Sequence, residues 1–264
     1  MAESIYTFNA SPIFHRIRES LLSLLFLALC VLGAFAIQAM TGFGSIVLAL
    51  TFGALVFDIK TLVPLLVVLN IMMTIPMAWM NRRHIEIQLL LKRILPLMLL
   101  GLLAGVLLSP LINELWAKLI FSGVIIWISL RSLFSTNSAP QSTTGRNLTI
   151  STAGIVHGLF ASGGPLLVYA LASSQINKQA FRATLLTLWA TLNLALTCWF
   201  LWQGKLVGQS LNILILAPCV FVGAWLGNIL HHKINEQLFL KVVFSLLLVV
   251  GLLLLVNSGI KLID

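Results

Sequence analysis

Long apolar bands separated by short polar loops run through the chain. A helix needs about 20 apolar residues to cross the hydrocarbon core of a membrane, and most of the bands reach that length. The pattern predicts an all-α polytopic membrane protein, with eight bands when 21–57 is counted as one interrupted unit. The bands lie at residues 21–39, 43–57, 61–80, 94–112, 115–134, 149–175, 181–203, 209–230 and 236–257.

Two of the apolar stretches are interrupted by glycine and polar residues. The first interruption reads QAMTGFGS at 38–45, and the second reads HGLFASGGP at 157–165. The pieces beside the second, 149–161 and 165–175, would form helices of about 20 Å and 17 Å, which are too short to cross alone. We therefore expect each interrupted unit to be a re-entrant hairpin or a broken helix near the middle of the membrane.

The pattern P-x4-G-x3-G-x7-N-E occurs twice, and the second copy begins 122 residues after the first. Glycines four positions apart place two small residues on one helix face, so that another helix can approach closely. We expect this close packing to lie inside each half of the chain. The residues are Pro96, Gly101, Gly105, Asn113 and Glu114 in the first copy, and Pro218, Gly223, Gly227, Asn235 and Glu236 in the second.

The duplication divides the chain into two homologous halves. A similar spacing separates Gly44 from Gly164 and Asn70 from Asn193. Internal repeats of this kind are typical of secondary transporters, and an old duplication in a membrane protein that does not transport is the alternative. The predicted units are an N-terminal segment at 1–20, repeat 1 at 21–134, a polar linker at 135–148, repeat 2 at 149–257 and a tail at 258–264.

The relative orientation of the halves depends on the interrupted units. Hairpins give each half an odd number of crossings and therefore inverted repeats, whereas single crossings give parallel repeats. The 16 Lys and Arg residues do not decide, because both arrangements place equally many on the cytoplasmic side. Both put Arg82, Arg83, Lys92 and Arg93 in the cytoplasm. The short arms beside the second interruption favour inverted repeats.

Composition excludes a soluble protein. Hydrophobic residues make up 59% of the 264 residues and charged residues 9%, whereas a soluble domain has about 25% charged residues. The net charge of +9 suits a small anionic substrate and the headgroups of a lipid bilayer. The charges are scattered among loops, so nucleic acid is not an expected partner. Cys30, Cys198 and Cys219 show no metal-ligand or disulfide spacing and are expected to be small buried hydrophobes, and no cofactor or metal is expected.

The two interruptions hold the candidate substrate site. Non-helical backbone at membrane depth persists only when it is buried in protein or lines a wet cavity. A helix that begins near Ser45 or Pro165 presents unpaired N–H groups and the positive end of its dipole, which together form an anion site. Hydroxyl groups of Thr41, Ser45 and Ser162 would add donors. The candidate substrate-binding residues are Gln38, Thr41, Gly42, Gly44, Ser45, Asn70, His157, Ser162, Gly163, Gly164 and Asn193.

The roles of His157 and of the two asparagines stay open. His157 is a candidate proton-coupled switch, a donor to the anion or a packing histidine, and Gln38 near the equivalent place cannot titrate. Asn70 and Asn193 lie inside apolar bands, where an amide either serves the site or joins helices by hydrogen bonds. Proton coupling is therefore an open alternative, as is a homo-oligomer.

Two other classes of protein compete with a transporter. Ser162-Gly163 near His157 invites comparison with intramembrane hydrolases of the rhomboid type, which use G-x-S-G. Position 160 is Phe, however, and His157 lies five residues from Ser162 on the same element, which is a poor placement for a general base. We therefore do not expect an enzyme. A membrane channel or a scaffold such as an insertase is the other alternative, and saturable flux would distinguish a carrier from both.

The interruptions resemble the paired glycine-rich motifs of the TauE/SafE family of sulfite exporters, also called the TSUP transporters. The similar segments are QAMTGFGSIVLALTF and GIVHGLFASGGPLLVYAL, supported by LLTLWATLNLALT and VGAWLGNIL, and the resemblance covers about 21–257. The first motif is thinner than in family members, which often have a run of glycines followed soon by a proline, whereas here the next proline is Pro64. The resemblance implies a multi-pass permease of the plasma membrane for sulfite, sulfoacetate or related organosulfonates. Together with the paired interruptions it leads us to expect alternating access around a midplane anion site.

Overall fold

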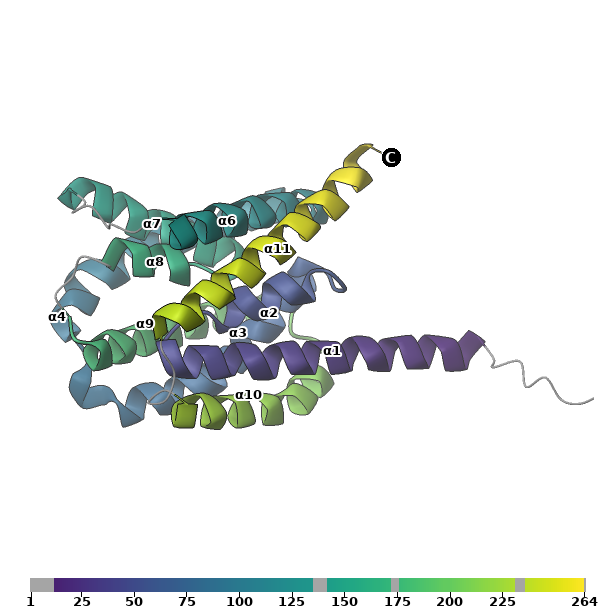
Figure 1. Ribbon diagram of the computed structural model, residues 1–264, viewed down its shortest axis with the longest axis horizontal. Coiled ribbons are helices and arrows are strands. Elements are labelled where there is room, and N and C mark those ends of the chain that lie inside the picture. The colour runs from purple at the N-terminus through teal and green to yellow at the C-terminus, as the bar shows by residue number, and fades with distance from the viewer. Residues whose placement is uncertain (1–11, 135–141, 172–175, 231–235, 264) are drawn as a thin grey trace, which may run out of the picture.

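The computed structural model describes residues 12–134, 142–171, 176–230 and 236–263, and the regular elements within them are all helical (Figure 1). Seven helices in this part of the chain are long and apolar enough to cross a membrane, which confirms the predicted fold class. The interrupted band predicted at 149–175 consists, in its described residues, of two shorter helices that meet at the interruption. The longer helices are α1 (Pro12–Thr41), α2 (Ser45–Gly53), α3 (Ile59–Met80), α5 (Leu95–Leu108), α6 (Glu114–Phe134), α7 (Thr143–Phe160), α8 (Gly164–Leu171), α9 (Lys178–Trp202), α10 (Ser210–Leu230) and α11 (Glu236–Ile263).

Four short elements connect these helices. The 3-10 turns η1 (Arg82–His84) and η3 (Ser109–Leu111) follow α3 and α5. A single helical turn, α4 (Ile87–Leu89), continues through the π-helical turn η2 (Leu90–Ile94) into α5, so that Ile87–Leu111 forms one apolar span.

Helices extend beyond three of the predicted boundaries. α1 begins within the predicted N-terminal segment, and α11 runs into the predicted tail. α7 begins at Thr143, six residues before the predicted start of repeat 2. The reason is a helix cap that lies within the polar stretch, because the hydroxyl of Ser142 accepts a hydrogen bond from the N–H of Gly145 at 3.1 Å.

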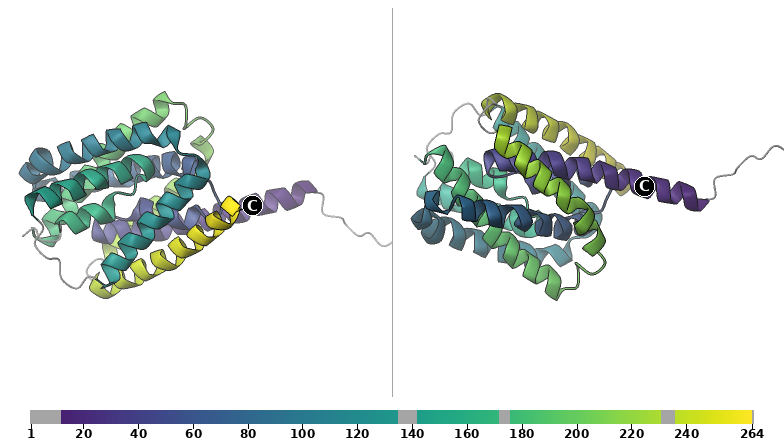
Figure 2. Two further views of the ribbon diagram at one scale, coloured as in Figure 1. Left: turned by 90° about the horizontal axis from the view of Figure 1, so that it is seen from above. Right: turned by 90° about the horizontal axis from the view of Figure 1, so that it is seen from below.

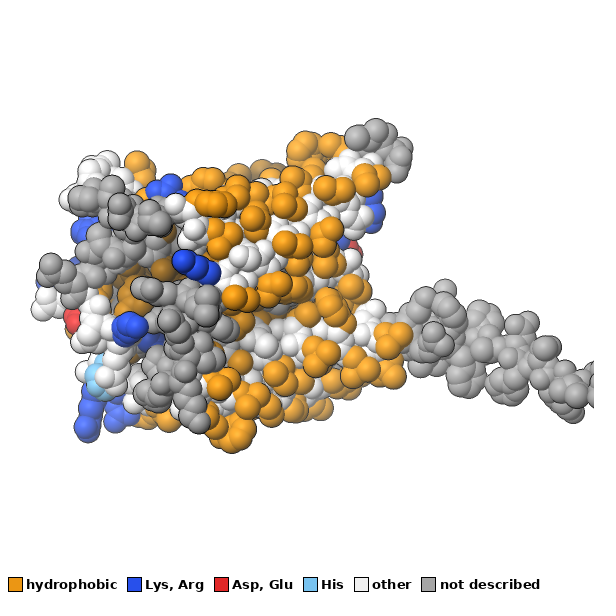
Figure 3. Space-filling model, in the orientation of Figure 1, with side chains coloured by type: hydrophobic (Ala, Val, Ile, Leu, Met, Phe, Trp, Pro, Cys, Tyr) orange, Lys and Arg blue, Asp and Glu red, His pale blue; other side chains and the backbone are white. Residues whose placement is uncertain are grey.

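The outside of the helix bundle is apolar. Hydrophobic side chains cover the middle of the face in Figure 3, and most Lys and Arg side chains lie toward its ends. This surface corrects the expectation for the cysteines, since Cys198 is exposed and Cys30 and Cys219 are only partly buried. A thiol is accommodated there because the outer face of a membrane helix contacts lipid rather than water.

Each interrupted unit is a hairpin. α1 and α2 are joined by three residues and pack side by side, as do α7 and α8, so the second helix of each pair runs back along the first. The arms are unequal. α1 contains a full-length apolar span at Leu21–Thr41, whereas α2 has 9 residues and α8 has 8.

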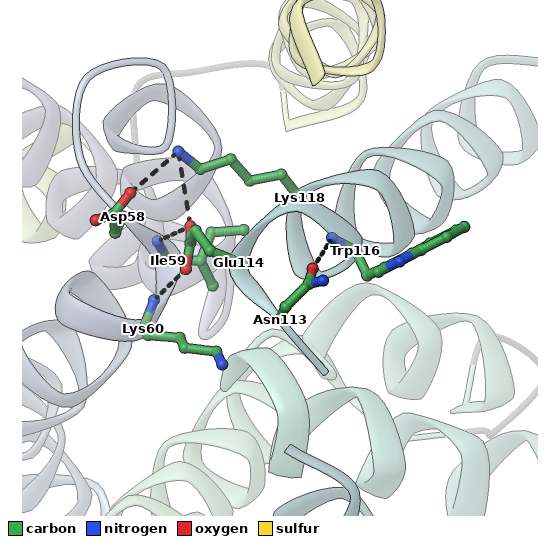
Figure 4. Close-up of polar contacts among 7 residues, drawn as sticks. All are labelled: Asp58, Ile59, Lys60, Asn113, Glu114, Trp116 and Lys118. Atoms are coloured by element: carbon green, nitrogen blue, oxygen red, sulfur yellow. Dashed lines mark hydrogen bonds and ion pairs between the residues drawn. The ribbon is translucent and has the colours of Figure 1, made fainter. Parts of the chain in front are cut away.

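The first copy of the repeated Asn-Glu pair stabilises two helix starts. Asn113 accepts a hydrogen bond from the N–H of Trp116 and caps α6. The carboxylate of Glu114 accepts hydrogen bonds from the N–H groups of Ile59 and Lys60 at the start of α3, at 2.7 Å and 3.3 Å (Figure 4). Lys118 lies 3.6 Å from Glu114 and 3.5 Å from Asp58. A negative charge at a helix N-terminus is favourable, so α6 fixes the start of α3. Asn235 and the side chain of Glu236, from the second copy, lie outside the described residues.

The two hairpins open toward opposite ends of the bundle. The Glu114 contacts place the starts of α3 and α6 at one end of the bundle. α2 ends at Gly53, shortly before α3 begins, so the first hairpin opens toward this end. At the other end, the N–H of Glu86 beyond α3 donates to the hydroxyl of Thr184 near the start of α9, at 2.9 Å. α8 leads into α9 at that end. Both termini of the described chain lie toward the first end (Figures 1 and 2).

The predicted halves interlock instead of forming two separate bundles. The most extensive packing pairs α5 with α7, α1 with α10, α6 with α11 and α3 with α9, and each pair takes one helix from each half. The prediction that the repeated glycines pack inside each half is therefore wrong. A Cβ built on Gly101 would lie 2.8 Å from the Cα of Gly154 in α7, and one on Gly227 would lie 2.8 Å from the Cβ of Ala39 in α1. The repeated glycines thus let the two halves approach each other closely.

Candidate functional site

A buried pocket lies where the tips of the two hairpins meet. Its volume is about 260 Å³, including the part open to solvent, and it contains no Asp, Glu, Lys or Arg among its lining residues. Phe43 at the first tip packs against Gly164 at the second, since a Cβ built on Gly164 would lie 3.5 Å from that side chain. The lining residues are Gln38, Gly44, Ile46, Val47, Asn70, His157, Ala161, Ser162, Gly164, Pro165, Trp189 and Asn193.

Left-handed backbone conformations build the two tips. Gly42 and Gly44 have φ angles of 88° and 104°, which glycine adopts without a steric penalty. In the second tip the place of Gly42 is taken by Ala161, with φ 51°. The turns otherwise match, because the N–H of Gly42 donates to the carbonyl of Gln38 and that of Ala161 donates to the carbonyl of His157, both at 2.7 Å. Gln38 and His157 thus hold equivalent places before the two turns.

A chain of side-chain hydrogen bonds crosses the pocket from one tip to the other. The Oε1 atom of Gln38 accepts from the N–H of Ser45 at 3.1 Å and from the Nδ2 of Asn70 at 3.0 Å. The Oδ1 of Asn70 accepts from the Nδ2 of Asn193 at 2.7 Å. The Oδ1 of Asn193 lies 3.1 Å from the Nε2 of His157. The five groups form one connected network, and all are buried.

The backbone N–H of Ser45 sets the direction of this network. Because a backbone N–H only donates, the Gln38 atom facing it is the carbonyl oxygen. The Asn70 group beside that oxygen must then be its NH2, and the same rule at the next bond makes Asn193 the donor to Asn70. Asn193 therefore presents its oxygen to His157, whose Nε2 must carry a proton.

With the hydrogen bonds directed in this way, two buried polar atoms of the pocket-lining residues have no hydrogen-bond partner in the protein. They are the Nε2 donor of Gln38 and the Nδ1 of His157. The Gln38 and His157 side chains are 2% and 1% exposed. Buried polar groups in proteins are nearly always hydrogen-bonded, so two unpartnered atoms at equivalent places make this pocket a candidate binding site. In neutral His157, Nδ1 is a hydrogen-bond acceptor, because Nε2 holds the proton.

Seven of the eleven predicted site residues line the pocket, and the other four shape its walls. Those in the lining are Gln38, Gly44, Asn70, His157, Ser162, Gly164 and Asn193. Thr41 and Gly42 form the first turn, and Ser45 joins the network. Gly163 packs on α7, where a Cβ would lie 3.0 Å from the Cβ of His157. Their roles in binding substrate stay predictions.

Part of the expected donor set is used inside the protein. The N–H of Ser45 is bonded to Gln38, so it is not the free helix-end donor that the sequence suggested. Thr41 donates its hydroxyl to the carbonyl of Phe43 at 2.8 Å, and Ser162 donates to the carbonyl of Phe160 at 2.9 Å. These hydroxyls close the sharp turns, whose carbonyls would otherwise be unpaired. In this structure Ser162 also makes no hydrogen bond to His157, the pair that a hydrolase would need.

Three side chains that support the walls of the pocket were not predicted from the sequence. The indole N–H of Trp189 on α9 donates to the carbonyl of Gly42 at 3.0 Å, and its ring stacks on His157 with centroids 5.3 Å apart. Thr74 and Thr197 donate to the carbonyls of Asn70 and Asn193 from the same helices. The repeated N-x3-T spacing was a usable signal for the threonines, but no spacing indicated Trp189.

Comparison with known protein families supports the resemblance noted in the sequence. A family model described as sulfite exporter TauE/SafE matches residues 15–254, which is nearly the whole chain. The chain belongs to the sulfite exporter TauE/SafE family. It is therefore a multi-pass membrane protein of a family that transports sulfite and related sulfur anions. Neither the curated proteins nor the solved structures compared with the chain gave a match.

Proposed function

We propose that this TauE/SafE protein is a secondary transporter of the cell membrane that binds one small sulfur-containing anion in the pocket between its hairpin tips. The observation that carries the proposal is the pair of unpartnered atoms, the Nε2 of Gln38 and the Nδ1 of His157, at equivalent places in the pocket. Buried polar atoms without an internal partner, in a pocket at the meeting point of two helix breaks, support a ligand site there.

The pocket attracts an anion without a buried cation. The first turns of α2 and α8 both line it, through Ile46, Val47, Gly164 and Pro165. Helix N-termini carry partial positive charge, and two that point at one cavity favour a negative group there. The Gln38 NH2 adds a directed donor. Trp189 and the aliphatic side chains provide the apolar part of the wall.

The network further supports proton coupling. An anion in contact with the His157 Nδ1 would meet its lone pair, which repels negative charge unless a proton lies between them. No charged side chain lines the pocket, and the ring is otherwise held by Trp189 and Asn193. We infer that a proton enters the site with each anion, carried by the His157 imidazole or by a hydroxyl of the substrate. Acidification then strengthens binding.

Alternating access is supported by a structural difference between the halves. α3 packs against both α2 and α10. The corresponding contacts of α9 with α8 and α5 are marginal, among the residues that the structure describes. We propose inverted repeats that alternate between these two packings, so that in the other state α9 packs closely against α8 and α5 while α3 loosens from α2 and α10. Because the halves interlock, the moving bodies contain helices from both.

Flux measurements in proteoliposomes test this function. Purified protein should take up labelled sulfite, sulfoacetate, thiosulfate or sulfate with saturation, and unlabelled substrate inside should accelerate uptake. A Gly164→Leu variant should lose uptake because its side chain enters the pocket, whereas Gly33→Leu should keep it because a Cβ there meets nothing within 4 Å. Equal uptake by both variants would exclude the pocket as the substrate site. Flux that never saturates would favour a channel, and absence of flux a scaffold.

A further inference from the structure

A second and larger cavity lies beyond the tip of the α7–α8 hairpin. It encloses about 550 Å³, including the part open to solvent, and is lined by α3, α5, α7 and α9. It occupies the region where α5 and α9 make only marginal contact. Gly158, Leu159 and Phe160 form part of its wall, and the adjoining residues His157 and Ala161 line the substrate pocket. One turn of α7 therefore separates the two spaces.

Two lysines provide the charge of this cavity. Lys60 at the start of α3 and Lys205 after α9 both line it, and no Asp or Glu does. Neither lysine forms an ion pair with a carboxylate of the described residues. The nearest acidic groups, Asp58 and Glu114, contact Lys118 and the N-terminus of α3. Figure 4 shows the side chain of Lys60 running away from them.

The remaining wall is apolar and partly aromatic. Trp199 and Phe200 contribute from α9, Phe160 from α7 and Val63 from α3. The Lys205 ammonium lies 5.5 Å from the centre of the Phe200 ring. Burial and the nearby charge of Lys60 lower the pKa of Lys205, as expected when two like charges share a space without an anion. Such a cavity fits a ligand with one anionic end and one apolar end.

We propose that this cavity is a second binding site, a vestibule that holds an organosulfonate with its sulfonate between Lys60 and Lys205 and its carbon chain against Trp199 and Phe200. The proposal rests on the proposed function, because it names organosulfonates over inorganic sulfite as the substrates and the cavity as their way to or from the pocket. Lys60 and Arg82 lie at opposite ends of α3. Since Arg82 is predicted to be cytoplasmic, the vestibule faces the other side of the membrane.

Iodide quenching of Trp199 fluorescence tests the site without any transport. The signal is the difference between the purified protein and a Trp199→Phe variant. We expect the iodide quenching constant to fall about fivefold in Lys60→Gln and about fivefold in Lys205→Gln, each compared with the parent protein. Loss of one positive charge at about 4 Å from an iodide ion in water costs about 1 kcal/mol, which corresponds to about fivefold. Lys92→Gln, at the opposite end of the bundle, is the matched control and should quench normally. Acrylamide, which is neutral, should quench all four proteins alike.

Competition then tests the ligand class. 1-Propanesulfonate should protect Trp199 from iodide at a concentration at least tenfold lower than sulfate needs, because only the sulfonate has a chain to bury against the rings. Equal protection by both anions would overturn the proposed ligand, and unchanged quenching in the double lysine variant would overturn the site.

The outcomes separate this proposal from the proposed function. If propanesulfonate protects Trp199 but no anion moves in proteoliposomes, the vestibule stands and transport fails. If anions move and the lysine variants quench normally, transport stands and the vestibule is wrong.

Discussion

Substitution of Gly101 by alanine tests the interlocking of the two halves. Gly101 on α5 meets Gly154 on α7, and the atoms around its missing Cβ are all backbone atoms. No side-chain rotation can make room, so the two helices must move apart. Gly123 on α6 is the matched control, because a Cβ there meets nothing within 4 Å.

The size of the effect follows from these distances. The new Cβ would lie 2.8 Å from the Cα of Gly154, whereas carbon atoms pack at about 3.5 to 4.0 Å. α5 must therefore retreat by about 1 Å. Overpacking of this kind costs about 1 to 3 kcal/mol of unfolding free energy, while alanine in place of glycine within a helix contributes about 1 kcal/mol. Gly123→Ala receives only the second contribution, so the two variants should differ by about 1 to 3 kcal/mol.

Thermal unfolding in detergent is the assay. Gly101→Ala should unfold several degrees below Gly123→Ala, by the usual relation of about 2 to 4 °C per kcal/mol for chains of this size. Gly223→Ala should behave like Gly101→Ala, because Gly223 holds the equivalent place in the second copy and meets the backbone of Leu32 and Ala36 in α1. Identical unfolding of Gly101→Ala and Gly123→Ala would refute the close approach of α5 and α7.

Three further substitutions test the polar network and the contact of Glu114 with the start of α3. Asn193→Leu should lower the unfolding free energy by about 1 to 3 kcal/mol for each partner left unpaired, Asn70 and His157, and normal thermal stability would contradict the network. The parent protein should bind its anion more weakly as pH rises from 5 to 8, and a flat profile would exclude proton coupling. His157→Gln should lose this dependence if the imidazole carries the proton and keep it if the substrate does. Glu114→Gln removes the negative charge at the start of α3 and should lower the unfolding free energy by about 0.5 to 1 kcal/mol. Denaturant titration measures this difference, which should shrink in high salt because salt screens the charge.

The sequence predicted the elements of the site better than their partners. α2 begins at Ser45 as expected, because the glycines before it end α1. The equal spacing of Asn70 and Asn193 within the halves predicted related roles, and the two side chains bond directly to each other. Periodicity and helix breakers are local properties, and they can be read from neighbouring residues alone.

Contacts between distant helices could not be read in this way. The glycine pattern indicated a close helix approach but not that the partner comes from the other half, because spacing on one helix does not identify the helix that faces it. The same limit hid Trp189, whose acceptor Gly42 is 147 residues away. The free helix-end donor expected at Ser45 was wrong for a related reason, since the side chain that satisfies it folds back from the other arm of the hairpin.

The central hydrogen bond between Asn70 and Asn193 bears on the ancestry of the chain. Two identical subunits related by a twofold axis would present the same asparagine from both sides, and neither direction of donation would be preferred. Within one chain, Gln38 and His157 have diverged at equivalent places, and the donor and acceptor are fixed. If the halves arose by duplication, as the repeated pattern predicts, joining them in one chain allowed a symmetric contact to become directional. One half then presents the free imidazole nitrogen of His157 and the other the amide donor of Gln38.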